Sequence, residues 1–117
     1  MSIDDSSDPA HEARLSALRM RFRMTLDQRV AGILANAAAV RVGPWPSAGS
    51  EAFVAEVHSL AGSAGLFGQD RVGEAAAAIE RILSGFARRQ TTTAVDVAML
   101  REAAQRLQTA HVSSAGR

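Results

Sequence analysis

Apolar residues recur every three or four positions along four stretches of this 117-residue chain, and no stretch sustains the two-residue alternation of a half-buried strand. A spacing of three or four collects apolar side chains on one face of an α-helix. The first stretch covers about residues 9–40, and β-branched residues are too few to favour strands. The pattern therefore predicts an all-α chain with four helices. The expected core positions are Leu15, Leu18, Phe22, Leu26, Val30, Ile33 and Ala37 in the first helix, Phe53, Val57, Leu60, Ala64 and Phe67 in the second, Val72, Ala75, Ile79, Ile82 and Phe86 in the third, and Leu100, Ala103, Leu107 and Ala110 in the fourth.

Three turn-forming segments separate the expected helices. Arg41–Ser50 holds two prolines and two glycines, so a continuous helix cannot pass through it. Gly65–Asp70 forms a glycine-bearing turn, and Arg88–Thr93 places two arginines before three threonines. Because the links between the last three helices are short, those helices have to run antiparallel. We therefore expect an antiparallel up-down four-helix bundle.

Local signals mark where two of the helices begin. Asp8 followed by Pro9 is typical of an N-cap and a first helical position. Thr93 is the expected N-cap of the last helix, and Asp96, three residues later, approximates a capping box. Trp45 stands between two prolines and is expected to cover one end of the bundle.

The composition excludes several classes of function. The chain has no cysteine, which excludes disulfides, thiol catalysis and cysteine-ligated zinc. All 13 basic residues are arginine, so a Schiff-base lysine and a Walker-type phosphate loop are excluded as well. A net charge of +1 is too close to neutral to indicate nucleic-acid binding.

The length and the hydropathy pattern predict a single domain without a membrane segment. No apolar run approaches the roughly 18 to 20 residues that a membrane-spanning helix needs. We expect a cytoplasmic, monomeric protein whose one domain covers residues 1–117, with flexible ends at 1–8 and 112–117. The tail from His111 onward is expected to be frayed, and both His11 and His111 to be ordinary surface residues.

His58 has an unusual setting on the second expected helix. It lies more than about 100° around the helix from the centre of the core stripe, so it is expected to face outward. Its surface neighbours are Ala61, Gly62 and Gly65, all of them tiny. Glycine inside a helix costs about 1 kcal/mol relative to alanine, so two glycines beside one imidazole need a reason. Access for a partner is such a reason, and an ordinary exposed histidine is the alternative.

The segment Glu56–Gly68, EVHSLAGSAGLFG, resembles the phosphorylation motif of histidine-containing phosphotransfer (HPt) domains. The resemblance is closest to the variant at the front of chemotaxis-type histidine kinases, which shares the small-Ala-Gly-x-Phe-Gly ending. It extends into the third helix, where the Ala-Ile-Glu run that ends at Glu80 is similar to the family's usual apolar–Glu ending. It covers roughly Phe22 to Ala110, and the HPt fold is the four-helix bundle expected above.

The resemblance implies roles for the residues around the histidine. His58 would be the phosphoryl acceptor, and Gly62 the small residue that leaves room beside it. The family usually has lysine three positions after the histidine, where it would place a cation near the phosphoryl group, and this chain has Ala61 there. Arg71 is the nearest arginine by sequence that could replace this lysine.

Other residues of the same helix are expected to meet a partner. By helical position, Val54 and Leu66 are docking contacts, with packing at the edge of the bundle as the alternative. Gly65, like Ala61 and Gly62, would keep the helix surface open to a partner.

The resemblance implies a phosphoryl carrier rather than a self-contained enzyme. His58 would accept a phosphoryl group from a receiver-domain aspartyl phosphate, or from a kinase, and pass it to a response regulator. The implied partners are receiver domains or a hybrid histidine kinase. The implied carrier has no cofactor of its own, and Mg²⁺ is expected on the partner receiver domain. A non-phosphorylated adaptor that binds a receiver or kinase through the same helix face is the second hypothesis, and a generic helical scaffold is the third.

Three other site patterns around His58 fail on structural grounds. The run Ala61–Gly65 is similar to a serine-hydrolase elbow, but that motif works only at a strand-to-helix turn. His58, Glu56 and Glu51 have the wrong spacing for a metal site on one helix face. The glycine run lacks the lysine and the preceding strand of a nucleotide loop. We therefore expect no hydrolase, metal or nucleotide site.

The first expected helix is rich in arginine. A solvated helix face is the ordinary explanation, and an interaction surface for an acidic partner is the alternative. Met20 and Met24 of the same helix are expected to fill the bundle. The arginines concerned are Arg14, Arg19, Arg21, Arg23 and Arg29.

Overall fold

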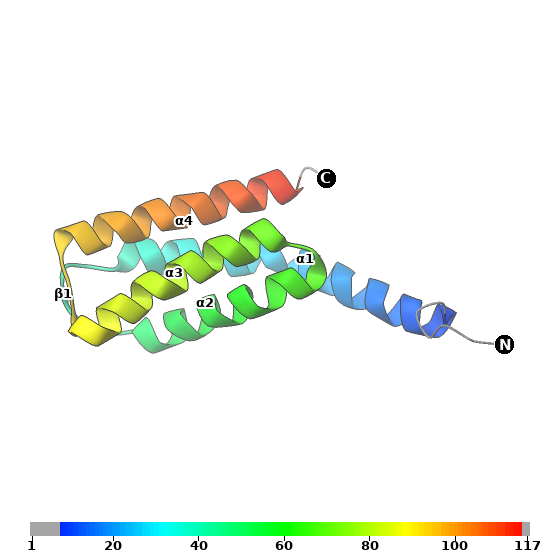
Figure 1. Cartoon of the computed structure of the whole chain (residues 1–117), viewed down its shortest axis with the longest axis horizontal. Helices are drawn as coiled ribbons and strands as arrows, with labels where there is room; N and C mark the ends of the chain where they lie inside the picture. Colours follow the sequence, from blue (N-terminus) through cyan, green and yellow to red (C-terminus); the bar gives the residue numbers. More distant parts are fainter. Residues whose placement is uncertain (1–7, 116–117) are drawn as a thin grey trace.

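Four helices make up most of the chain in the computed structural model, which describes residues 8–115. The helices pack antiparallel in up-down order, as Figure 1 shows. The prediction of an all-α four-helix bundle is therefore confirmed. The helices are α1 (Pro9–Ala39), α2 (Ser50–Ala64), α3 (Asp70–Arg89) and α4 (Ala94–Ala115), and a short 3-10 helix, η2 (Gly65–Phe67), follows α2.

Side-chain caps start α1 and α4 where the sequence predicted them. The Asp8 carboxylate accepts a hydrogen bond from the Ala10 backbone N–H at 3.1 Å. At α4 the Thr93 hydroxyl accepts from the Asp96 N–H at 3.1 Å, and the Asp96 carboxylate accepts from the Thr93 N–H at 2.8 Å. These reciprocal bonds satisfy backbone donors that a helix N-terminus leaves free. The hydrogen bond from the Thr93 backbone lowers the pKa of the Asp96 carboxyl below its ordinary value, and Arg89 adds to this shift.

The connection between α2 and α3 turns sharply after η2. Gly68 ends η2 with a φ of 78°, in the left-handed region where a side chain is strained. Its N–H donates to the Gly65 carbonyl at 3.2 Å, and the Gln69 N–H donates to the Ala64 carbonyl at 2.9 Å. The turn therefore depends on glycine and folds α3 back along α2.

A minimal β-ladder joins two loops at the other end of the bundle, which corrects the expectation that the chain forms no strands. The strand β1 (Gly43–Pro44) pairs antiparallel with β2 (Thr91–Thr92). The buried Thr92 hydroxyl donates to the Arg41 carbonyl at 2.7 Å. The pairing arises because the α1–α2 and α3–α4 connections reach the same end of the bundle. The pattern of one segment alone does not reveal such a meeting.

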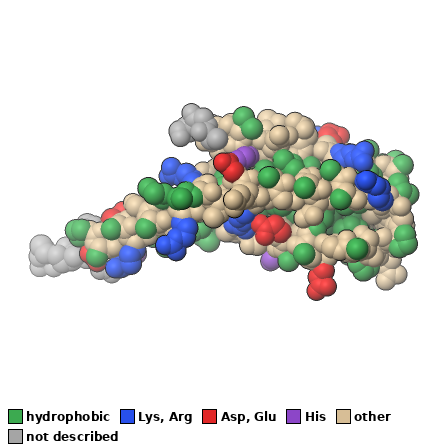
Figure 2. Space-filling view, turned by 180° about the vertical axis from the view of Figure 1, so that it is seen from behind, with side chains coloured by type: hydrophobic (Ala, Val, Ile, Leu, Met, Phe, Trp, Pro, Cys, Tyr) green, Lys and Arg blue, Asp and Glu red, His purple; other side chains and the backbone are tan. Residues whose placement is uncertain are grey.

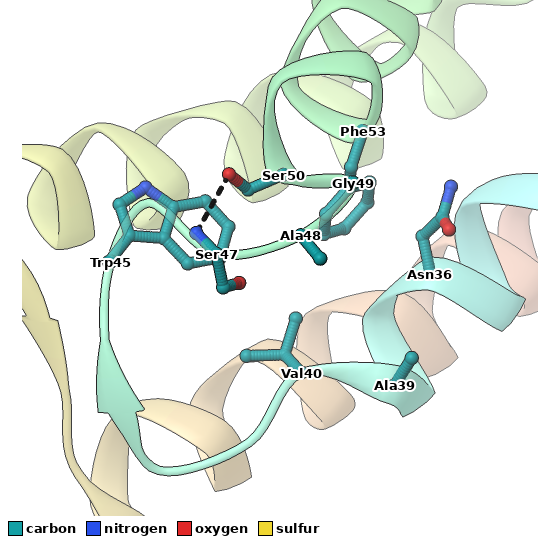
Figure 3. Close-up of a pocket in the computed structure, with 9 residues that line it drawn as sticks. All are labelled: Asn36, Ala39, Val40, Trp45, Ser47, Ala48, Gly49, Ser50 and Phe53. Atoms are coloured by element: carbon teal, nitrogen blue, oxygen red, sulfur yellow. Dashed lines mark hydrogen bonds between the residues drawn. The ribbon is translucent and has the colours of Figure 1, made fainter.

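Trp45 covers this end of the bundle, as predicted. Its side chain is buried and meets the Phe86 ring edge-on, with the ring centroids 5.3 Å apart. A cavity of about 60 Å³ lies beside it, and the Ser47 N–H donates to the Ser50 hydroxyl on its wall (Figure 3). Because His58 does not line this cavity, the cavity is not part of the candidate site.

The core follows the predicted stripes of α2 and α4, and on α3 it includes Val72, Ile79 and Phe86 as predicted but differs at the other two positions. Ala75 and Ile82 are only half-buried, whereas Ala76 and Leu83 are buried. Both sets of positions satisfy a helical period of 3.6 residues. Since α3 packs against both α2 and α4, the directions of its two neighbours decide which set points inward.

The first turns of α1 correct a second expectation about the core. Leu18 is 45 % exposed and Leu15 half-buried, and Met20 and Met24 are exposed instead of filling the bundle. The buried residues of α1 begin at Phe22. With 31 residues α1 is longer than the other helices, so its N-terminal part projects past the turn between α2 and α3 (Figure 1).

The end of the chain differs from the expected frayed tail. The helix α4 continues through His111 to Ala115, and the His111 Nε2 contacts the Asp27 carboxylate on α1. His111 is thus half-buried rather than an ordinary surface residue, while His11 is exposed. The expected flexible segment at the N-terminus lies outside the described residues except for the cap Asp8. None of the helices between residues 8 and 115 has the length and hydrophobicity that a membrane crossing requires.

Candidate functional site

His58 lies on the solvent side of α2, as its spacing predicted. Its side chain is 76 % exposed, whereas its neighbours Val57 and Leu60 are completely buried. These two core contacts fix the rotation of α2 about its axis. The same helix period that buries them holds the imidazole outward.

Glu80 of α3 holds the imidazole from one side. Its carboxylate contacts the His58 Nδ1, and the Glu80 side chain is 32 % exposed. An ionised carboxylate only accepts hydrogen bonds, so the proton of a neutral ring lies on Nδ1. The Nε2 of His58 is then unprotonated, with its lone pair available as a nucleophile. The sequence pattern included Glu80 in a motif of the third helix but did not indicate that it contacts the histidine.

A glycine on α3 allows the two helices to lie close enough for this contact. Gly73 is buried, and a Cβ built on it would lie 3.4 Å from the Ala64 Cβ and 3.7 Å from the Ala61 carbonyl oxygen. The space at Gly73 thus holds a methyl group at most, and any larger side chain would push α2 and α3 apart. Gly73 precedes Glu80 by seven residues, which is two helical turns along the same face. The close approach at Gly73 therefore brings Glu80 within reach of His58.

Gly62 leaves the surface beside His58 bare. It is exposed, and a Cβ built on it would meet nothing within 4 Å. Gly65 is also exposed, with only the Asp70 carboxylate at 3.9 Å from such a Cβ, and its φ is an ordinary −63°. Neither backbone conformation nor packing requires glycine at these two positions. Glycine weakens a helix by about 1 kcal/mol relative to alanine, and the packing of the described residues does not account for these two glycines.

The other expected contact residues differ in how far solvent reaches them. Leu66 is 79 % exposed, so its side chain is free to meet a partner. Val54 and Ala61 are half-buried and pack against the core. Val54 therefore packs at the edge of the bundle, which was the alternative to its role as a docking contact. Leu66 does not pack there.

Arg29 of α1 holds α2 from the side opposite Glu80, which corrects its assignment to a solvated face. Its guanidinium donates to the Glu56 carboxylate at 3.0 Å and to the Ser59 hydroxyl at 2.9 Å. It also reaches the Ser63 hydroxyl at 3.4 Å. The sequence signal for this contact was the polar row Glu56, Ser59 and Ser63, spaced by three and four residues on one side of α2. The row alone did not name the partner, which lies 27 to 34 residues away.

No arginine replaces the missing lysine within the described part of the chain. The polar contact of His58 there is with Glu80, and Arg71 is exposed without a contact to the imidazole. Between residues 8 and 115 no group of three or more histidine or acidic side chains is placed to hold a metal ion. The site is therefore one oriented imidazole on an open helix surface.

Comparison with known proteins matches the chain to a family. No curated protein and no solved structure matches the chain. The family model described as "Hpt domain" matches residues 17–110, which is most of the chain. Proteins with this domain are phosphoryl carriers rather than self-contained enzymes, have no cofactor of their own, and work with two-component signalling partners. The chain belongs to the Hpt domain family, and its role is in histidine phosphotransfer within a phosphorelay.

Proposed function

We propose that His58 is the residue of this chain that carries the phosphoryl group. The observation that supports it best is the His58–Glu80 pair beside the bare surface at Gly62. The pair orients the ring with Nε2 outward, and the surface admits the active site of a partner. A helix surface suffices, because phosphoryl transfer depends mainly on positioning and on charge stabilisation.

The transfer is an exchange of one bond to phosphorus for another. The Nε2 lone pair of His58 attacks the phosphorus of an aspartyl phosphate on a receiver domain. A P–N bond forms, the P–O bond to the aspartate breaks, and the aspartate leaves as a carboxylate. The ring then carries its proton on Nδ1, where Glu80 accepts the hydrogen bond. The reverse reaction passes the phosphoryl group to the aspartate of a second receiver domain.

The receiver domain supplies the positive charge in this proposal. The chain has alanine where the family usually has lysine, so the cation beside the phosphoryl group is the Mg²⁺ bound by the partner. Exposed Leu66, together with Gly62 and Gly65, forms the surface that the receiver contacts. The protein acts in this scheme as a cytoplasmic monomer.

Incubation with a receiver domain that carries a radiolabelled aspartyl phosphate tests the proposal. We expect acid-labile, base-stable label on this chain in the presence of Mg²⁺, and none on the His58→Gln variant. The His11→Gln variant is the matched control, because His11 is exposed on the same protein without a carboxylate partner among the contacts described. Label on His58→Gln equal to that on the unaltered chain would contradict the proposal.

A non-phosphorylated adaptor is the second candidate, and Ala61 is the residue that favours it. An adaptor would bind a receiver domain through the same face of α2 without taking label. Titration of the fluorescently tagged receiver separates the two functions. Binding of equal strength by the unaltered chain and by His58→Gln, with no label on either, would establish the adaptor instead of the carrier.

A further inference from the structure

The projecting part of α1 carries an apolar stripe that the bundle does not cover. We call residues 9–21 the α1 arm. Phe22 marks where the bundle ends, because it is buried and its ring stacks on Phe67 with centroids 4.7 Å apart. Leu15 and Leu18 continue the stripe of Phe22 outward, yet Leu18 is 45 % exposed. The arm extends about 20 Å at 1.5 Å per residue. It is therefore long enough to pair with another helix over almost two heptads.

Arginines flank this stripe on both sides. With Leu15 and Leu18 at the a and d positions of a heptad, Phe22 takes the next a position. Arg14 and Arg21 then both occupy g positions. In Figure 2, basic and apolar side chains lie along the projecting arm. The e and g positions of a helix pair are the ones that set partner choice through charge.

The second flank, at the e positions, carries one charge of each sign. Arg19 occupies the e position between Leu18 and Phe22, and Glu12, the one acidic residue within the arm, occupies the e position one heptad earlier. A parallel second copy would place Arg14 opposite Arg19. An antiparallel copy would place Arg14 opposite Arg21 and Glu12 opposite Arg19, so an acidic helix fits the three arginines better than a second copy does. Nucleic acid would favour arginines gathered on one face, whereas here an apolar stripe separates them.

We propose that the α1 arm is a docking site for an acidic amphipathic α-helix of another protein. The partner helix places apolar residues against Leu15 and Leu18 and acidic residues beside Arg14, Arg19 and Arg21. Apolar burial contributes affinity, and the charges select the partner and its register. This interaction is separate from phosphotransfer, because the arm projects beyond the end of the bundle (Figure 1).

A pair of synthetic three-heptad peptides tests the proposal on the full chain. Both carry leucine at every a and d position, with glutamate at every e and g position of the first and lysine at those of the second. We expect the glutamate peptide to bind in fluorescence anisotropy and to gain helicity in circular dichroism at 222 nm. The lysine peptide should bind at least about tenfold more weakly, because its charges face arginines. Higher salt should weaken binding of the glutamate peptide.

Variants with matched controls separate the apolar stripe from the charge. Leu18→Ala should weaken binding of the glutamate peptide about tenfold, while Met20→Ala, which removes an exposed side chain from the opposite face of the arm, should leave it unchanged. Arg14→Glu combined with Arg21→Glu should reverse the preference between the two peptides. Arg81→Glu combined with Arg101→Glu, at exposed positions of α3 and α4, is the control for overall charge. Thermal unfolding of each variant should match that of the unaltered chain, since all these residues are exposed.

Three results would overturn the proposal. The first is equal affinity for the two peptides. The second is affinity for duplex DNA or for vesicles of phosphatidylglycerol that equals that for the glutamate peptide and does not change in Leu18→Ala. The third is a dimer in sedimentation that Leu18→Ala abolishes, because it would assign the stripe to a second copy of the chain.

Discussion

His58 and His111 are each paired with a carboxylate on a neighbouring helix, but opposite members of the two pairs face solvent. The His58 side chain is 76 % exposed and its partner Glu80 is 32 % exposed. In the other pair His111 is 15 % exposed, while Asp27 is 82 % exposed. The two pairs share the same side-chain chemistry. They differ in which group a partner protein reaches.

This difference shows that a histidine–carboxylate pair is not by itself a site. The Nδ1 of His58 meets Glu80, which leaves Nε2 toward solvent. His111 meets Asp27 through Nε2, and its Nδ1 is buried without a hydrogen-bond partner. No phosphoryl donor can approach a buried nitrogen. Access thus separates the candidate nucleophile from a histidine that joins α4 to α1.

The strongest test of this comparison replaces each of the two histidines in turn with glutamine. His58→Gln should abolish phosphoryl label, because it removes the nucleophile. His111→Gln should keep the label at the level of the unaltered chain and reduce the free energy of unfolding by at most about 1 kcal/mol, as expected for one partly exposed pair. Transfer assays and urea unfolding measure the two effects. Loss of label in His111→Gln with an unchanged fold would remove the distinction.

Substitutions of the two carboxylates, Glu80 and Asp27, should also differ in their effect on the transfer rate, and the effect should be smaller than that of replacing His58. Glu80→Ala should slow transfer at least about tenfold, because the ring loses the acceptor that orients it and holds its proton on Nδ1. Glu80→Gln should recover part of the rate, since an amide oxygen still accepts from Nδ1. Asp27→Ala should leave the rate unchanged.

Single-turnover transfer from a phosphorylated receiver measures these rates, with its pH profile as a second readout. A merely structural role of Glu80 would lower thermal stability in Glu80→Ala without changing that profile. Equal rates for Glu80→Ala and Asp27→Ala would mean that Glu80 has no specific role at His58.

Substitutions of Gly62 test whether the open surface beside His58 gives a partner access to the imidazole. Gly62→Leu should slow transfer several-fold, because its side chain occupies the space a partner needs. Gly62→Ala should instead raise the free energy of unfolding by about 0.5 to 1 kcal/mol, since glycine is the weaker helix former. Gly32 of α1 is the matched control, because it is also exposed and a Cβ there meets nothing within 4 Å. Gly32→Leu should leave transfer unchanged, and equal slowing by both leucines would contradict a role for access.

The smallest effect concerns Asp96, a carboxylate paired with backbone and arginine rather than with imidazole. Its pKa in the folded chain lies below the ordinary value of 3.8, first because the Thr93 N–H donates to it. Its contribution to stability is therefore present above pH 3.8 and is lost as the pH falls through the lower, folded pKa. Asp96→Asn should be less stable than the unaltered chain at pH 7, and the difference should shrink below about pH 3.8. Urea unfolding across pH 2 to 7 measures it, and a difference independent of pH would contradict the assignment.

Short-range patterns predicted the parts of this molecule that depend on neighbours along the chain. The caps at Asp8 and Thr93 were predicted correctly, because each involves residues two or three positions apart. The outward direction of His58 was predicted for the same reason, since the core stripe of its own helix defines it. On α3 the predictions for Ala75 and Ile82 were off by one residue, because neighbouring positions share the helical period and only the adjacent helices decide between them.

Contacts between distant segments were not predicted. Glu80 meets His58 across 22 residues, and Arg29 meets Ser59 across 30. The ladder between the loops joins Gly43 to Thr92. Each of these contacts depends on the direction and spacing of two helices, which no local pattern specifies. The exposure of Leu18 likewise depends on where the other helices end.

The sequence by itself determined the four helices, the turns that make them antiparallel, and a histidine on the face away from the core. It could do so because hydrophobic period, capping and turn residues act within a few positions of one another. The tertiary structure alone decided which carboxylate orients His58, which arginine holds its helix, and which apolar residues are left uncovered on α1. These features depend on packing between helices, where a close approach at Gly73 determines what meets across the interface.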